Sequence, residues 1–219
     1  MKLIIIEGGE NVGKTTLVNK LKEKYGDRIH YAKFPSSELM DLYKNVVTMD
    51  DDSVTKTFDF IVDLITEEYE ELKNKDIVLI DRFHLSTLVY QGTGEIDGID
   101  GMILLNYGYL YEDLNITKND VKTFILTKQY PVNTKEKRTE AQKQNDENAE
   151  KINEKYMKLI MNLDLYSDLG TYKVYSEKDY VVTPKYIYPA GIGYVVKNDN
   201  YIFDEVSYHI DECLIELNK

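Results

Sequence analysis

Residues 8–15 carry the pattern Gly-x4-Gly-Lys-Thr, which is typical of a loop that binds nucleotide phosphates. Gly8 and Gly13 allow backbone turns that a side chain would block, so that successive N–H groups converge on phosphate oxygens. Lys14 can reach the outer phosphates, and the hydroxyl of Thr15 can bind Mg²⁺. The pattern therefore predicts a nucleotide site, to which the neighbouring loop residues also contribute: Asn11, Val12 and Thr16.

The loop lies between two elements that suit this role. The apolar run over residues 3–6 predicts a buried strand over 2–7, and the amphipathic stretch after the loop predicts a helix over about 14–25. The positive N-terminal end of that helix favours bound phosphate. Because the pattern requires a strand before the loop and a helix after it, this context strengthens the prediction.

A second group of candidate residues follows a short apolar strand predicted over 76–81. Asp81 ends this strand, so its carboxylate is expected at the C-terminal edge of the sheet, where open α/β sheets bind ligands. A carboxylate there can hold a water on Mg²⁺, and Arg82 can bind an anionic acceptor through a forked contact. Taken alone, an Asp-Arg pair is also common at the start of a helix.

The alternation of strands with helices along the chain predicts an α/β fold. We expect one domain over residues 1–219, with a parallel sheet of about five strands and helices on both faces. The other predicted strands are 28–34, 121–126 and 172–175, and the other predicted helices are 53–73, 84–91, 99–113, 134–164 and a final C-terminal helix.

Two segments depart from the pattern of a packed core. Residues 134–151 are highly charged with almost no apolar stripe, which indicates either a solvated helix face or a lid, over about 133–150, above a phosphate site. The tyrosine-rich stretch 180–196 contains the turn signal Pro189-Ala190-Gly191 and predicts an inserted hairpin over about 180–200. This hairpin is expected to pack, to contact a second copy in a homodimer, or to touch substrate.

The composition limits the partners. A net charge of −12 argues against an extended nucleic-acid or anionic-membrane surface, so the expected partners are small-molecule nucleotides. No apolar run approaches the ~20 residues needed to cross a bilayer. The single cysteine, Cys213, excludes an internal disulfide and fits the cytoplasm.

Four segments together resemble the thymidylate kinase family of P-loop nucleoside monophosphate kinases. The opening EGGENVGKTT resembles EG-x-D-x-x-GK-[ST]-T, and DRFHLSTLVYQG (81–92) resembles DRY-x-x-S-x-x-AYQG. Phe34-Pro35 is similar to the family's FP pair, and INEKYMKL (152–159) to V-R-x-x-Y-L-x-L. The resemblance covers roughly residues 1–165. It implies a P-loop kinase fold and phosphoryl transfer from ATP, with Mg²⁺, to the 5′-phosphate of a deoxynucleoside monophosphate, thymidylate or a related pyrimidine deoxynucleotide.

The resemblance also implies residue roles. Lys14 and Thr15 would hold the donor phosphates and Mg²⁺, Asp81 would organise the metal, and Arg82 would bind the phosphate of the acceptor. The catalytic residues would be Lys14, Arg82, Arg138 in the lid and Glu10, which stands where the family has an acidic residue near the acceptor sugar. The residues that would bind the acceptor are Glu10, Phe34, Phe58, Arg82, Ser86, Tyr90 and Gln91.

The chain departs from the family in its arginines, of which it has three: Arg28, Arg82 and Arg138. Ser36-Ser37 follow the FP pair where the family usually has an arginine, and the family's ADR segment is replaced by Val62-Asp63-Leu64. Arg28 is expected to begin a strand away from the site. Arg82 is therefore the only arginine left for the acceptor phosphate, with Lys33 as the neighbouring cation.

Two alternatives stay open. A kinase of a nucleoside or of another hydroxyl acceptor would use Glu10 as general base. The other alternative is a nucleotide-binding protein without transfer activity or a GTP-driven switch, of which the switch would need a guanine motif. Residues 117–120 (TKND) come close to that motif but precede a strand, where such motifs follow one. The histidine nearest the motifs, His84, is interpreted as structural, with the lining of the acceptor pocket as the alternative.

Overall fold

The computed structural model describes residues 1–9, 12–34, 53–92, 98–117, 120–126, 140–161, 171–175 and 199–219. Glu10, Asn11 and Arg138 lie outside the described residues, as do the hairpin over 180–196 and the lid residues before 140. Helix α3 includes Phe58, but its side chain is also outside the described part. The roles of these residues remain predictions.

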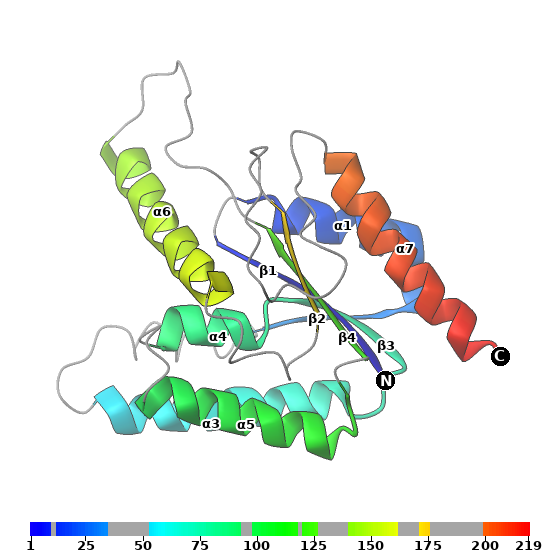
Figure 1. Cartoon of the computed structure of the whole chain (residues 1–219), viewed down its shortest axis with the longest axis horizontal. Coiled ribbons are helices and arrows are strands. Elements are labelled where there is room, and N and C mark those ends of the chain that lie inside the picture. Colours follow the sequence, from blue (N-terminus) through cyan, green and yellow to red (C-terminus); the bar gives the residue numbers. More distant parts are fainter. Residues whose placement is uncertain are drawn as a thin grey trace.

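Five parallel strands form one sheet, in the order β2-β3-β1-β4-β5 (Figure 1). The strands are β1 (Lys2–Gly8), β2 (His30–Lys33), β3 (Ile77–Asp81), β4 (Val121–Leu126) and β5 (Thr171–Tyr175). β1 lies at the centre because it pairs with β3 on one side and with β4 on the other. This buried position explains its continuous apolar sequence, which is typical of a parallel strand covered on both faces.

Helices cover both faces of the sheet, as the sequence predicts (Figure 1). One face carries α1 (Lys14–Tyr25) and α7 (Asp199–Leu217), and the other carries α3 (Ser53–Leu72), α4 (His84–Gln91) and α5 (Gly98–Asp113). Helix α6 (Glu140–Met161) packs against α4. Two apolar cores result, and β1 contributes alternate residues to them: Leu3 and Ile5 to the first, Ile4 and Ile6 to the second. Within the described part of the chain, no helix is long and apolar enough to span a membrane.

The sequence prediction was wrong at the start of β2. Residues 26–28 form a short 3₁₀ helix, and the strand begins only at His30. Gly26 ends α1 with a φ of 53°, and the chain makes one further turn there before it extends. Arg28 therefore lies on this turn and donates hydrogen bonds to the carbonyl oxygens of Lys24 (2.9 Å) and Tyr25 (3.3 Å).

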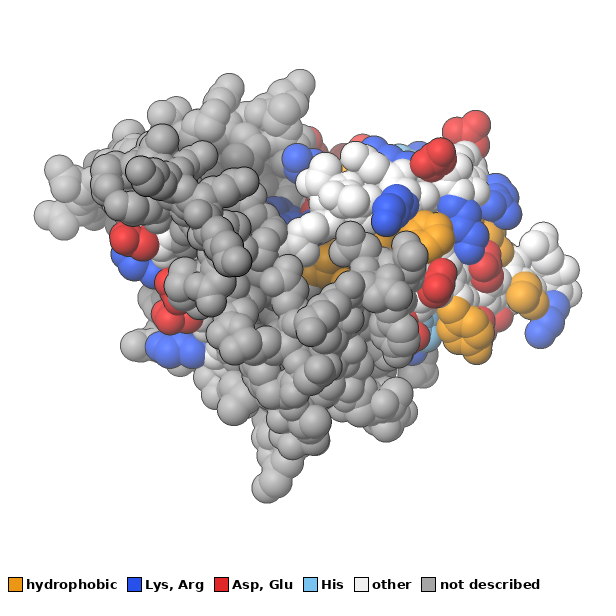
Figure 2. Space-filling view, turned by 90° about the horizontal axis from the view of Figure 1, so that it is seen from above, with side chains coloured by type: hydrophobic (Ala, Val, Ile, Leu, Met, Phe, Trp, Pro, Cys, Tyr) orange, Lys and Arg blue, Asp and Glu red, His pale blue; other side chains and the backbone are white. Residues whose placement is uncertain are grey.

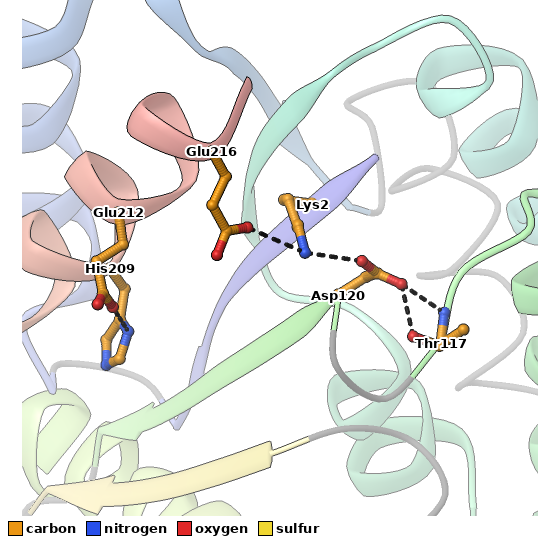
Figure 3. A network of polar contacts seen from close by, with 6 residues as sticks. All are labelled: Lys2, Thr117, Asp120, His209, Glu212 and Glu216. Carbon is orange, nitrogen blue, oxygen red and sulfur yellow. Dashed lines mark hydrogen bonds and ion pairs between the residues drawn. The ribbon is translucent and has the colours of Figure 1, made fainter. Parts of the chain in front are cut away.

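Polar contacts join three elements at the N-terminal edge of the sheet (Figure 3). The Lys2 ammonium lies 2.9 Å from Asp120 and 3.5 Å from Glu216, while Asp120 accepts hydrogen bonds from the backbone N–H and hydroxyl of Thr117. Because the strands are parallel, this edge is opposite to the one where β1 enters the phosphate loop. Thr117 and Asp120 are thus bonded to each other away from the nucleotide loop, which argues against a guanine-binding role for these two residues.

Candidate functional site

The phosphate loop requires glycine at its two ends. Gly8 has a φ of 134°, and a Cβ atom added there would overlap the carbonyl oxygen of Leu126 on β4. Gly13 has a φ of 92° and is the left-handed residue from which α1 starts. Both conformations favour glycine because it lacks Cβ. The predicted strand before the loop, the predicted helix after it and the glycine conformations at both ends of the loop are therefore confirmed.

Lys14 is the first residue of α1, and its side chain turns back over the loop. Its ammonium donates hydrogen bonds to the carbonyl oxygens of Gly8, at 2.8 Å, and Gly9. Only 6% of the residue is exposed. A buried cation at the N-terminus of a helix produces a strongly positive local field, which suits a bound phosphate.

The two motifs predicted from sequence meet in one cavity of about 490 Å³. The loop side contributes Val12, Gly13, Lys14, Thr15 and Thr16, and the opposite side contributes Lys33, Asp81 and Arg82. Lys33 and Asp81 are adjacent because β2 and β3 pair in register at these residues. Three cations and one carboxylate around a single cavity favour an anionic ligand that carries a metal ion.

The carboxylate of Asp81 fits a cation. The residue is 5% exposed, and its Oδ1 has no hydrogen-bond partner among the described residues. A buried, unpaired carboxylate oxygen is costly unless a cation or water satisfies it. The described residues contain no cluster of three His, Cys, Asp or Glu side chains. This donor set suits Mg²⁺, which takes one or two protein ligands and completes its shell with phosphates and waters.

The backbone of Arg82 is left-handed, with a φ of 72°. For a residue with a side chain, such a conformation costs about 1–3 kcal/mol and persists only where the surroundings impose it. The guanidinium Nη1 donates to the carbonyl oxygen of Gly8 (3.3 Å) and to the hydroxyl of Tyr90 (3.2 Å), and its Cζ lies 5.1 Å from the Tyr90 ring centroid. Arg82 is thus held beside the loop, and its hydrogen bond to Gly8 means that Arg82 and Lys14 share one carbonyl oxygen.

Glu7 lies behind the described cavity and contacts residues next to Arg82, which we did not predict from the sequence. Its side chain is fully buried at the end of β1. Oε1 accepts hydrogen bonds from the backbone N–H groups of Phe83 (2.8 Å) and Ser86 (3.2 Å), and Oε2 accepts from the hydroxyls of Ser86 (2.6 Å) and Tyr156 (3.0 Å). Burial raises the pKa of the Glu7 carboxyl, while the hydrogen bonds from Ser86 and the charge of Arg82 oppose the rise. The available signal was a lone acidic residue at the end of an otherwise apolar central strand.

The other residues predicted to bind the acceptor have different surroundings. Tyr90 contacts Arg82 and so belongs to the site. Ser86 is buried and bonded to Glu7, and Phe34 is buried in the core, with its ring centroid 6.1 Å from that of Phe83. Gln91 is half-buried at the end of α4. Direct contact of Ser86, Phe34 and Gln91 with an acceptor stays a prediction.

His84 is a core residue, as interpreted from the sequence. It is fully buried among the rings of Phe83, Tyr107 and Tyr111, and its Nδ1 lies 3.2 Å from the Tyr111 hydroxyl. Burial lowers the pKa of His84 to about 3. The imidazole is therefore neutral at physiological pH and does not line the described cavity.

His84 is expected to make the folded state sensitive to acid. In the unfolded chain a histidine has a pKa near 6.5, so below that pH the unfolded state binds one more proton than the folded state. The contribution of the neutral His84 to the free energy of unfolding is therefore complete above pH 6.5 and is lost as the pH falls toward 3. The difference in free energy of unfolding between the wild type and His84→Asn should fall by about 1.4 kcal/mol per pH unit between pH 6 and 4. Urea unfolding of both proteins at several pH values measures this difference in free energy. A difference that does not change with pH would contradict the prediction.

The central strand, the glycine loop, the returning lysine and the Asp81–Arg82 turn on the neighbouring strand define a P-loop kinase fold. The chain belongs to the thymidylate kinase family, because the Thymidylate kinase family model matches residues 6–178.

One curated protein and one solved structure are similar to this chain. A probable thymidylate kinase 1 of Saccharolobus solfataricus is 30% identical over an alignment of 101 residues, and the match covers 44% of this chain and 53% of that protein. The match thus spans about half the length of this curated relative. The crystal structure of thymidylate kinase from Ehrlichia chaffeensis has a TM-score of 0.52 and 20% identity, and covers 95% of this chain and 98% of that one. At this identity the similarity shows the fold alone.

Proposed function

We propose that the protein transfers the terminal phosphoryl group of ATP to the 5′-phosphate of a deoxynucleoside monophosphate, thymidylate or a related pyrimidine deoxynucleotide. The observation that carries this proposal is the single cavity where Lys14 of the phosphate loop, Asp81 and Arg82 meet. Membership of the thymidylate kinase family supports it. Phosphoryl transfer depends mainly on positioning and on neutralising charge, which is what these residues supply.

Each lining residue has a role in this reaction. Lys14 binds the outer phosphates of ATP, and Arg82, assisted by Lys33, binds the phosphate of the acceptor. Thr15 and Asp81 would hold Mg²⁺, which supplies positive charge for the phosphate oxygens when bound. The acceptor phosphate is ionised at neutral pH and is already a nucleophile. The reaction therefore needs no serine, cysteine or histidine nucleophile, which is consistent with the structural role of His84 in the core.

Glu10 and Arg138 complete the proposed catalytic set. Because Asn11 offers no cation from the loop, Arg138 would supply the lid cation and Glu10 would lie near the acceptor sugar. Phe58 would contact the base of the acceptor. These three roles follow from the family resemblance of the sequence.

The proposed partners are nucleotides in the cytoplasm. Figure 2 shows one face of the molecule. Over its described part, acidic and basic side chains are interspersed without a continuous basic area. Together with the net charge of −12, this supports small-molecule nucleotides over an extended nucleic acid. A homodimer is proposed as the assembly, and the oligomeric state in solution would test it.

A second candidate is a nucleoside kinase, whose acceptor is a hydroxyl. The observation that favours it is the small number of cations on the acceptor side of the cavity, where the described residues supply Arg82 and Lys33. A nucleoside needs no phosphate-binding arginine, but it needs a general base, for which Glu10 is the candidate.

A panel of acceptors separates the two candidates. Purified protein with ATP and Mg²⁺ is assayed for ADP release with thymidine, deoxyuridine and the monophosphates dTMP, dUMP, dCMP, dAMP and dGMP. We expect the fastest release with a pyrimidine monophosphate and none above the acceptor-free control with thymidine. Good use of thymidine with no use of any monophosphate would contradict the proposal and favour the nucleoside kinase.

A further inference from the structure

The carboxylate of Glu7 performs the work of a helix cap. Helix α4 begins at His84 without a hydrogen bond from the side chain of its own N-cap residue, Phe83. Instead, the Glu7 Oε1 atom accepts hydrogen bonds from the N–H groups of Phe83, the N-cap residue, and Ser86, the third residue of the helix. A carboxylate at a helix N-terminus is stabilising because it meets both the unpaired N–H groups and the helix dipole. Here β1 supplies it from 76 residues away.

The same contacts fix the strained turn at Arg82. The Arg82 N–H donates to the carbonyl oxygen of Ile6 at 3.0 Å, and the next N–H, of Phe83, donates to Glu7 at 2.8 Å. The left-handed residue is therefore held on both sides by two successive residues of β1. Since such a conformation persists only when its surroundings impose it, these two contacts hold the backbone from which the Arg82 side chain extends.

Glu7 also connects this turn to α6. Its Oε2 accepts from Tyr156 of α6 at 3.0 Å, and the Tyr156 and Ser86 hydroxyls lie 2.7 Å apart. Tyr156 is fully buried. A second contact between the helices is the hydrogen bond from the Lys155 ammonium to the carbonyl oxygen of Val89, at 3.1 Å. Tyr156 thus ties α6 to the carboxylate that holds the Arg82 turn.

We propose that Glu7 is a positioning residue that sets the orientation of the Arg82 guanidinium. Because Tyr156 donates to Glu7, this orientation also depends on how helix α6 packs against α4. The effect on turnover rests on the proposed function, because it assumes that Arg82 binds the acceptor phosphate. The effect on the Arg82 conformation does not.

A neighbouring network offers a matched control. Thr87, next to Ser86 on α4, lies 2.8 Å from the hydroxyl of Tyr107, which donates to Glu68 at 2.9 Å. Tyr107 and Tyr156 are both fully buried, and each hydroxyl joins an α4 hydroxyl to a buried glutamate. Only the network of Tyr156 contains the carboxylate that contacts the Arg82 turn. Tyr107→Phe keeps the ring that packs against Phe83 and removes only a hydroxyl that is bonded to Thr87 and Glu68, not to Glu7.

The conformational test is the ¹H–¹⁵N spectrum of the arginine Nε–Hε groups. The chain has three arginines, so the spectrum has three such signals, and Arg82→Lys identifies the one from Arg82. Glu7→Gln keeps the size of the side chain and one oxygen that can accept from the N–H groups of Phe83 and Ser86, but it removes the charge, so the fold is expected to survive. We expect the Arg82 signal to shift in Glu7→Gln and Tyr156→Phe and to stay in place in Tyr107→Phe.

Steady-state kinetics test the consequence for turnover. Glu7→Gln is expected to raise the KM of the monophosphate about tenfold and Tyr156→Phe about threefold, with the KM of ATP changed less than twofold. Tyr107→Phe should leave both constants unchanged, although thermal unfolding should show a similar loss of stability for the two tyrosine variants.

The outcomes are separable. An Arg82 signal that stays in place in both Tyr156→Phe and Glu7→Gln, or that moves as far in Tyr107→Phe, overturns the positioning role. If Glu7→Gln does not fold, Tyr156→Phe against Tyr107→Phe decides the proposal by the same spectrum. If the wild type phosphorylates no monophosphate, the proposed function fails, and the spectra still decide whether Glu7 positions Arg82.

Discussion

Replacement of Lys14 by alanine is expected to lower kcat by roughly 10²–10³-fold, which is the usual loss when one preorganised charged donor is removed from a transition state. The ammonium is buried over the loop and shares its cavity with Thr15 and Asp81. A cation held there needs little reorganisation when phosphate charge develops. Initial rates at saturating ATP and acceptor measure the effect.

The Lys14 variant also loses its hydrogen bonds to Gly8 and Gly9, so stability must be measured beside activity. Lys22→Ala is the matched control, because it removes an exposed lysine from the same helix. The expected pattern is a cooperative thermal transition in both variants and lost turnover only in Lys14→Ala. A well-folded Lys14→Ala protein that keeps most of its activity would remove the donor-site assignment.

Replacement of Arg82 by alanine is expected nearly to abolish the use of monophosphates, with a loss in kcat/KM of about 30-fold to more than 10³-fold. Arg82 is the only arginine in the described cavity, and Lys33 cannot replace its planar fork. Arg82→Lys is expected to impair the enzyme for the same reason. Kinetics across the common deoxynucleoside monophosphates measure these losses.

Strain and charge at Arg82 can be separated by a glycine variant. Glycine adopts the φ of 72° without cost, whereas alanine keeps the strain. Arg82→Gly should therefore unfold at a higher temperature than Arg82→Ala while being equally inactive. Arg28→Lys, on the 3₁₀ turn outside the described cavity, should keep wild-type kinetics. Unimpaired use of monophosphates by Arg82→Ala or Arg82→Gly would refute the role of Arg82 as the ligand of the acceptor phosphate.

The parts of the site that the sequence predicted are those encoded locally. The glycines, Lys14 and the strand before them lie within one short segment whose spacing reflects the geometry of a single loop. Asp81 was placed by the rule that parallel strands end at a common edge, and the register of β2 with β3 confirms it. Lys33 reaches the same cavity through that register.

The parts that were missed depend on contacts between distant segments. Glu7 and Tyr156 are 149 residues apart, and no periodicity reports that the two side chains share a hydrogen bond. Ser86 was interpreted through the family motif, yet its hydroxyl is bonded to Glu7. The start of β2 was misplaced because a turn that continues after Gly26 depends on backbone geometry, which residue composition does not specify.

The carbonyl oxygen of Gly8 accepts both the Lys14 ammonium, at 2.8 Å, and the Arg82 guanidinium, at 3.3 Å. The two nitrogen atoms therefore cannot lie farther apart than these two lengths laid end to end. For the proposed transfer, the distance between the donor-side and acceptor-side cations is set by one oxygen atom of the central strand. Through this one carbonyl group, the middle of the sheet thus limits how far the donor-side and acceptor-side cations can separate.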